Sequence, residues 1–161
     1  FNRPHLQYRV TPRRSALRQV LEVIGKHDGE SGIVYCNSRN GTERLAARLK
    51  ENGVAAAPYH AGMDAAARSR NQEAFIRDDL QVICATIAFG MGIDKPDVRF
   101  VIHQDLPKNL EGYYQETGRA GRDGLSADCV LLFNASDVTK PPGFLEEKDD
   151  VHAPPVARRV V

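Results

Sequence analysis

The stretch Ile33-Val34-Tyr35-Cys36 decides the fold class, because it is apolar throughout and shows no alternation of polar and apolar residues. A strand of this composition is covered on both faces, as in a parallel sheet that has helices on each side. It is followed by a helix whose Leu45, Ala46 and Leu49 face inward, and then by a second strand at 54–59. The order of strand, helix and strand predicts a βαβ unit.

The same alternation continues outward in both directions. Towards the amino terminus, a half-buried strand at 5–10 precedes a helix at about 17–24 whose apolar residues repeat at i, i+3, i+4 and i+7. The elements expected towards the carboxyl terminus are a helix capped by Asp64 with Phe75 and Ile76 facing inward, a helix starting near Asn109, and strands at 81–86, 98–103 and 128–133. We therefore predict an α/β fold: a doubly wound, mostly parallel sheet with helices on both faces.

The chain has 161 residues, the length of about one domain. We expect that domain to span 1–138 and to be followed by an irregular tail at 139–161, since Pro141-Pro142-Gly143 interrupts any helix. In sheets of this class, working groups gather in the loops at the carboxyl ends of the strands. The informative residues are expected to lie in those loops.

The composition, with 42% hydrophobic and 27% charged residues, is typical of a soluble globular protein. No apolar stretch approaches the roughly 20 residues that cross a bilayer, and no secretory signal opens the chain. These features predict no membrane partner and an intracellular location. Cys36, Cys84 and Cys129 lie in or beside apolar strands without C-x-x-C spacing, so we expect buried thiols and no metal site.

The net charge gives no sign of a polyanionic partner, because the 22 Lys and Arg residues are nearly balanced by 21 Asp and Glu residues. If a nucleic acid binds, the local placement of charge must be responsible. A cationic pattern does occur in the segment 115–124, where Gln115, Gly118, Arg119 and Arg122 are spaced i, i+3, i+4 and i+7. While the segment stays helical, these residues share one stripe.

Fixed guanidinium groups beside glycines suit a phosphate chain whose negative charge grows in a transition state. The alternative for the same stripe is a solvated helix end with ordinary Arg–Asp pairing. The complete string Q-x-x-G-R-x-G-R favours the phosphate interpretation.

This string resembles the sixth conserved motif of the superfamily-two helicases, and the longer string 113–124 resembles the RecQ branch of that superfamily. Segments 34–39, 59–62 and 85–96 also resemble RecQ motifs and come in the family's order. The resemblance covers the chain from about its first strand to Asp137. It implies a RecA-like fold and the second, C-terminal motor lobe of an ATP-dependent DNA helicase with 3′-to-5′ polarity, which acts in repair or recombination.

Carried over to this chain, the resemblance implies that Arg122 is an arginine finger that reaches the γ-phosphate, while Arg119 senses that phosphate and couples it to DNA. Gln115 would contact the nucleotide or the neighbouring lobe, and Asp94 would face the ribose or transmit the nucleotide state. No G-x-x-x-x-G-K-[ST] loop and no Asp-Glu dipeptide occur. ATP and Mg²⁺ would therefore be held mainly by an N-terminal RecA-like lobe, and this lobe alone would have no ATPase activity.

The expected DNA-binding residues follow strands and would hold the phosphates of a single strand without reading bases. They are Ser38, Arg39, His60, Gly62 and Thr86. Each has a structural alternative: Ser38 and Thr86 would cap helices, and His60 would be a hydrogen-bonded structural histidine. Phe89 and Met91 fit either a core or an inter-lobe cleft.

The DNA partner would be single-stranded DNA and duplex junctions. The location would be the cytoplasm, on the nucleoid, in a bacterium, and the nucleus in a eukaryote. Two other functions remain open: a non-catalytic nucleic-acid-binding or partner-docking module, and the C-terminal lobe of an RNA helicase. The string 89–96 favours the DNA branch over the RNA branch, by resemblance alone.

Overall fold

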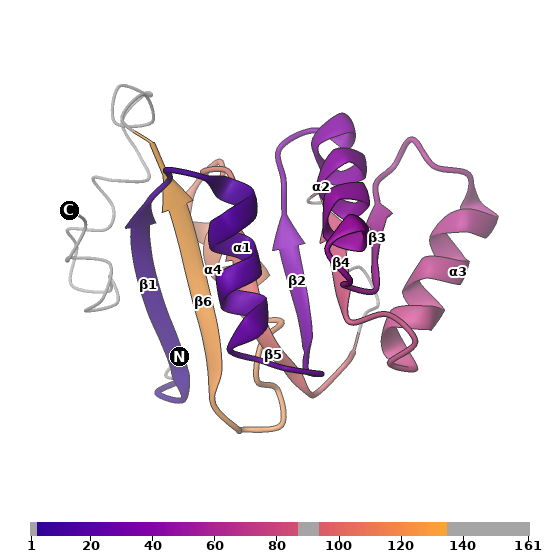
Figure 1. Cartoon of the computed structure of the whole chain (residues 1–161). Coiled ribbons are helices and arrows are strands. Elements are labelled where there is room, and N and C mark those ends of the chain that lie inside the picture. The colour runs from indigo at the N-terminus through magenta and orange to yellow at the C-terminus, as the bar shows by residue number, and fades with distance from the viewer. Residues whose placement is uncertain (1–2, 87–93, 135–161) are drawn as a thin grey trace.

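The computed structural model describes residues 3–86 and 94–134. Their strands form a six-stranded sheet in the order β1-β6-β5-β2-β4-β3 (Figure 1), and every paired neighbour is parallel. The strands are β1 (Leu6–Pro12), β2 (Ser31–Tyr35), β3 (Ala56–Tyr59), β4 (Val82–Ala85), β5 (Val98–His103) and β6 (Ala127–Phe133). The predicted α/β sheet is confirmed, and within the described residues it is wholly parallel.

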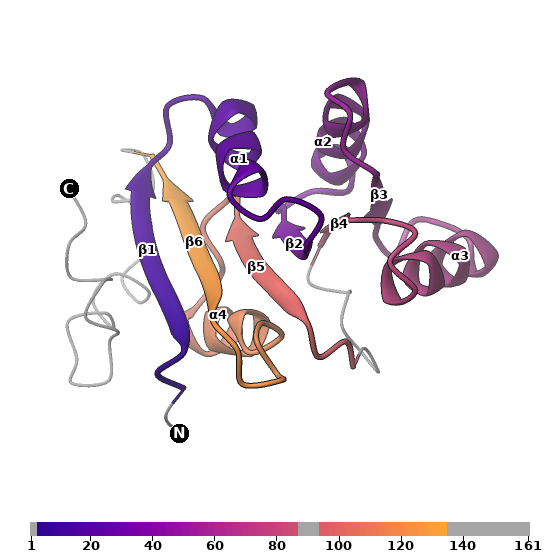
Figure 2. The same cartoon turned by 60° about the horizontal axis from the view of Figure 1, so that its bottom comes forward.

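Helices cover both faces of this sheet, as predicted. The helices α1 (Ala16–Gly25) and α2 (Arg39–Glu51) lie on one face, and α3 (Ala65–Ile76) and α4 (Leu110–Thr117) lie on the other (Figure 2). The apolar core is accordingly divided by the sheet. One cluster joins α1 and α2 to the strands, and another packs Phe75 of α3 against the opposite face.

Short polar side chains set where three of the helices begin, each just after the chain leaves the carboxyl edge of the sheet. Ser38 Oγ accepts from Gly41 N at 2.9 Å, Asp64 Oδ1 from Ala67 N at 2.8 Å, and Asn109 Oδ1 from Gly112 N at 2.7 Å. Each side chain satisfies an amide that has no partner inside its helix. The cap expected at Asp64 and the helix start expected near Asn109 are both confirmed.

One prediction about the core was wrong. Phe75 is fully buried, but Ile76, at the end of α3, is 40% exposed. Successive helical residues point about 100° apart, and in the last turn of α3 it is Phe75 that faces the sheet while Ile76 points towards solvent. The three cysteines are buried and unpaired, as expected.

Two segments named above lie outside the described residues: the loop that carries Phe89 and Met91, and the tail at 139–161. Among the helices in the part of the chain that the structure describes, none combines the length and the apolar character needed to cross a bilayer.

Candidate functional site

The cationic segment is a loop beyond a helix rather than a continuous helical stripe. Helix α4 ends at Thr117, with Gly118 as its C-cap, and Gly121 has a φ of +58°. The helical condition for a single stripe therefore does not hold as far as Arg122, because the helix ends at Thr117 and a residue with positive φ breaks the helical repeat. We call residues 118–122 the finger loop.

The finger loop is anchored on both sides of Arg122 to the amino end of β5. Gly121 N donates to Val98 O at 2.9 Å, and Asp123 N donates to Pro96 O at 3.0 Å. The carboxylate of Asp123 accepts from the buried Arg99 guanidinium at 2.6 Å, and this bond lowers the pKa of Asp123. The backbone on either side of Arg122 is thus fixed by the lobe itself.

This location corrects the expectation that all working groups lie at the carboxyl ends of strands. Val98 is the first residue of β5, so the finger loop lies at the opposite, amino edge of the sheet. The reason is that α4 runs back across the sheet from its carboxyl edge, and the motif lies where that helix ends. Arg119 and Arg122 are therefore presented on the α4 face.

Arg122 forms an ion pair with Asp94, which the family resemblance also assigned to the nucleotide. Arg122 Nη1 lies 3.3 Å from Asp94 Oδ1, and the two side chains are 35% and 84% exposed. The Arg–Asp pairing considered as the alternative is therefore present. An exposed pair of this kind contributes about 0–1 kcal/mol, so a stronger anion can displace it. Arg122 remains accessible from solvent.

Arg119 is more enclosed than Arg122. Together with Gln115 and Lys108 it lines a cavity of about 240 Å³. Its buried Nε atom has no hydrogen-bond partner, and the buried hydroxyl of Tyr35, another residue of that cavity, faces the Arg119 guanidinium. Burial is the main reason that the pKa of Tyr35 lies well above its usual value, and the negative charge of Glu116 raises it further. The nearby Arg119 guanidinium lowers this pKa and so opposes the shift. The cavity thus contains polar groups that a ligand or a partner can satisfy.

A second cavity, of about 310 Å³, opens at the carboxyl ends of the strands and shares Tyr35, Lys108 and Glu116 with the first. Its wall includes His103, which is 1% exposed, stacks on Tyr35 at 5.1 Å and donates from Nε2 to Glu116 Oε1 at 2.7 Å. The sequence analysis missed Tyr35, His103 and Glu116. The sequence signal that could have indicated this wall is a histidine at the carboxyl end of an apolar strand.

The residues expected to bind DNA lie at the carboxyl ends of β2, β4 and β3, which are neighbours in the sheet. Arg39 and Thr86 line the 310 Å³ cavity. Arg39 also packs over Gly62, where an added Cβ would lie 3.1 Å from Arg39 Nη1. The glycine makes room for the arginine, so this edge offers an exposed guanidinium beside an open cavity.

Two of the expected DNA contacts take their structural alternatives. Ser38 caps α2, as described above. His60 is 4% exposed, and both of its ring nitrogens are bonded: Nε2 donates to Glu43 Oε2 at 2.6 Å, and Nδ1 accepts from Gly62 N at 3.0 Å. Neither nitrogen is left for a phosphate in this arrangement, so His60 shapes the loop beneath Arg39.

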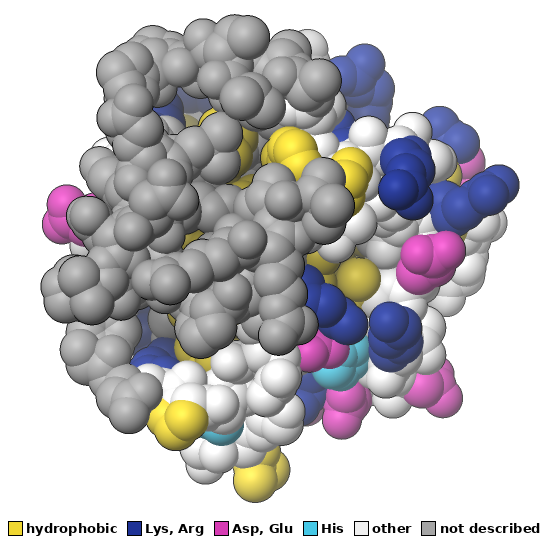
Figure 3. All heavy atoms as spheres, turned by 90° about the vertical axis from the view of Figure 1, so that its left-hand side faces the viewer, with side chains coloured by type: hydrophobic (Ala, Val, Ile, Leu, Met, Phe, Trp, Pro, Cys, Tyr) yellow, Lys and Arg dark blue, Asp and Glu magenta, His cyan; other side chains and the backbone are white. Residues whose placement is uncertain are grey.

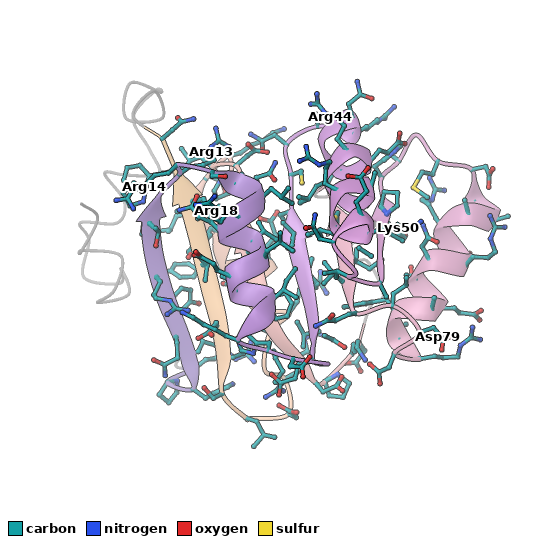
Figure 4. All side chains as sticks on the ribbon, in the orientation of Figure 1. Arg13, Arg14, Arg18, Arg44, Lys50 and Asp79 are labelled. Atoms are coloured by element: carbon teal, nitrogen blue, oxygen red, sulfur yellow. The ribbon has the colours of Figure 1, made fainter. Side chains whose placement is uncertain are left out.

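Positive charge also gathers beyond the expected residues. Lys and Arg side chains are concentrated in the upper right of the face on the β1 side (Figure 3), and Arg14, Arg18 and Arg44 lie in the upper part of Figure 4, on or beside α1 and α2. All three are exposed, and none has an ion pair with a described residue. We call them the basic rim. A net charge of +1 conceals this local excess.

Comparison with known proteins agrees with this fold. Residues 13–124 match the family described as helicase conserved C-terminal domain. The DEAD-box protein SrmB of E. coli aligns with a TM-score of 0.74 at 23% identity, over 81% of this chain and 78% of that one. A DEAD-box protein of Methanococcus jannaschii aligns with a TM-score of 0.75 at 23% identity, over 84% of this chain and 38% of that one. These structural likenesses show a RecA-like fold, and the chain belongs to the helicase conserved C-terminal domain family.

Within that family the chain is a C-terminal lobe of the RecQ type. It is 50% identical over 150 residues to the ATP-dependent DNA helicase RecQ of Haemophilus influenzae, which covers 93% of this chain and 24% of the relative. It is also 50% identical over 154 residues to the RecQ-like DNA helicase BLM of Xenopus laevis, covering 93% of this chain and 11% of the relative. The chain thus spans about a quarter or less of the length of these curated relatives.

Proposed function

We propose that this lobe is the C-terminal half of the motor of an ATP-dependent DNA helicase that moves with 3′-to-5′ polarity. Arg122 would act as the arginine finger on the γ-phosphate, and Arg119 would sense the same phosphate from its cavity. Gln115 lines the Arg119 cavity and Asp94 pairs with Arg122. That geometry supports nucleotide-facing roles for both residues. The observation that carries the proposal is an accessible guanidinium on a backbone anchored on both sides.

The residues of this lobe fit contacts to the γ-phosphate of a bound ATP, but they do not include a loop that cradles the phosphate chain. Arg122 and Arg119 supply positive charge at an accessible surface, and Arg119 Nε lacks a partner. The sequence contains no phosphate-cradling loop with a lysine, so ATP and Mg²⁺ would be held mainly by an N-terminal RecA-like lobe. Bound Mg·ATP supplies the bond that is broken. The residues of this chain stabilise the charge that develops and couple it to DNA.

Single-stranded DNA would run along the carboxyl edge of the sheet, over Arg39, Thr86 and the loop at Gly62. The basic rim extends this edge with cations that attract phosphates without reading bases. The relatives at 50% identity are named DNA helicases, whereas the likeness to DEAD-box structures is at 23%. This contrast supports DNA over RNA. We further propose a role at single strands and junctions in repair or recombination, on the nucleoid in a bacterium or in the nucleus in a eukaryote.

The isolated lobe tests the division of labour between lobes. We expect the purified chain to show no Mg²⁺-dependent ATP hydrolysis, with or without single-stranded DNA, because its sequence has no Gly-rich loop with a lysine to cradle the phosphates. The full-length protein should unwind a duplex with a 3′ overhang in the presence of Mg·ATP. Measurable ATPase activity of the isolated lobe would contradict the proposal.

The same preparation separates the motor from a simple binding module. We expect the lobe alone to bind labelled single-stranded DNA weakly, with an affinity that falls as salt is raised. Tight binding by the lobe, together with no unwinding by the full-length protein, would favour the non-catalytic module.

A further inference from the structure

An arginine far away in the sequence holds the finger loop. Arg3 precedes β1, and its Nη1 donates to Gly118 O at 2.8 Å. Its Nη2 donates to Ala120 O at 2.7 Å and to Gly121 O at 3.1 Å. These carbonyls lie on both sides of Arg119 and directly before Arg122. One guanidinium therefore ties together most of the finger-loop backbone.

The chemistry of this contact follows from where the loop lies. The last carbonyls of a helix have no donor within the helix and carry the negative end of its dipole. Residues 118–121 follow the end of α4 and include a glycine at positive φ, so their carbonyl groups lie outside the helix and outside the strand ladders. A planar guanidinium can reach several carbonyls at once, which the ammonium of a lysine does less well.

Neighbours of Arg3 reinforce the same attachment. His5 Nε2 donates to Gly121 O at 2.8 Å, so that one carbonyl accepts from both side chains. Tyr8 and Thr117 share a hydrogen bond of 3.2 Å at the end of α4. Leu6 N donates to Arg3 O at 3.1 Å and closes the turn that carries Arg3. The segment 3–8 and the finger loop thus form one connected unit.

Arg3 has no acidic partner among the described residues, so its contacts serve the backbone of the loop. Substituting it leaves no buried carboxylate behind. The change removes three donors from the loop while the anchors at Val98 and Pro96 remain. The expected effect is a finger loop that persists but samples more orientations.

We propose that Arg3 is a positioning residue for phosphoryl transfer: it orients the finger loop so that Arg119 and Arg122 reach the γ-phosphate. The inference rests on the proposed function, because it gives Arg3 a role only through those arginines. A small displacement of a catalytic group costs up to roughly 100-fold in rate. Arg3 acts through the loop and does not itself touch the nucleotide.

The test is steady-state ATPase kinetics of the full-length protein, with saturating single-stranded DNA, for Arg3→Ala and Arg3→Lys. We expect kcat to fall about 10-fold in Arg3→Ala and less in Arg3→Lys, with the KM for ATP and the affinity for DNA nearly unchanged. Arg9→Ala is the matched control, since Arg9 lies in the adjoining strand and makes a partly exposed ion pair with Asp128 at 3.5 Å. Its kcat should equal that of the wild type.

A double-mutant cycle distinguishes positioning from general stabilisation. If Arg3 acts through Arg122, adding Arg3→Ala to Arg122→Ala should lower kcat far less than it does in the wild type. An equal loss in both backgrounds, or no loss in Arg3→Ala, would overturn the inference. If Arg3→Ala does not fold, the same comparison with Arg3→Lys decides. An Arg122→Ala protein with normal turnover would instead refute the proposed function.

Discussion

Substituting Arg122→Ala in the full-length protein should lower the turnover of ATP by about 10³- to 10⁵-fold, the range that arginine fingers contribute in related phosphoryl-transfer enzymes. The affinity for ATP should change little, because the guanidinium acts on charge that develops only in the transition state. The measurement is steady-state ATPase activity with saturating single-stranded DNA, together with a separate nucleotide-binding titration.

The lobe should remain folded in this variant. Arg122 is partly exposed and its ion pair with Asp94 is 3.3 Å long and open to solvent, so its loss costs at most about 1 kcal/mol. Arg77→Ala is a suitable control, since Arg77 also makes an exposed ion pair, with Asp79 at 3.2 Å, but at the end of α3. Unchanged turnover in Arg122→Ala, or an equal loss in Arg77→Ala, would refute the finger assignment.

Substituting Gly121→Ala should have the second largest effect, about a 100-fold loss of turnover. At a φ of +58° a side chain costs roughly 1–2 kcal/mol. The new Cβ would also lie 2.8 Å from Leu125 O and 3.0 Å from the His5 ring. The backbone oxygen cannot rotate away as a flexible side chain would, so the finger loop must move and carry Arg122 with it.

Gly29→Ala separates displacement of the loop from loss of stability. Gly29 has a φ of +75°, and an added Cβ there meets nothing within 4 Å. Both variants should have a lower melting temperature, but only Gly121→Ala should lose turnover. If Gly121→Ala retained full turnover, the position of the finger loop would not limit the hydrolysis of ATP, and this prediction would be wrong.

The fold could be predicted because its signals are local. The unbroken apolar run at 33–36, the cap at Asp64, the helix start near Asn109 and the buried cysteines depend on residues close together in sequence, and the structure confirms them. Ile76 was placed wrongly because the pattern does not show which of two adjacent apolar residues a helix turns towards the sheet.

The site was harder to predict, because it depends on contacts between distant segments. The spacing of Arg119 and Arg122 identified the motif, but not that α4 ends at Thr117 and leaves Arg122 on a loop. The contact from Arg3 joins residues 115 or more positions apart, and no spacing rule indicates it. The bond that occupies Nε2 of His60 goes to Glu43 on α2, a distant element that the sequence did not single out, whereas Nδ1 bonds the nearby Gly62 amide.

The most direct test of the central claim is the binding of a transition-state analogue. ADP with aluminium fluoride and Mg²⁺ should bind the full-length protein, in the presence of single-stranded DNA, at least about 100-fold more tightly than ADP alone. In Arg122→Ala this preference should largely disappear while the affinity for ADP stays unchanged. A variant that kept the full preference for the analogue would show that Arg122 does not reach the transferred phosphoryl group.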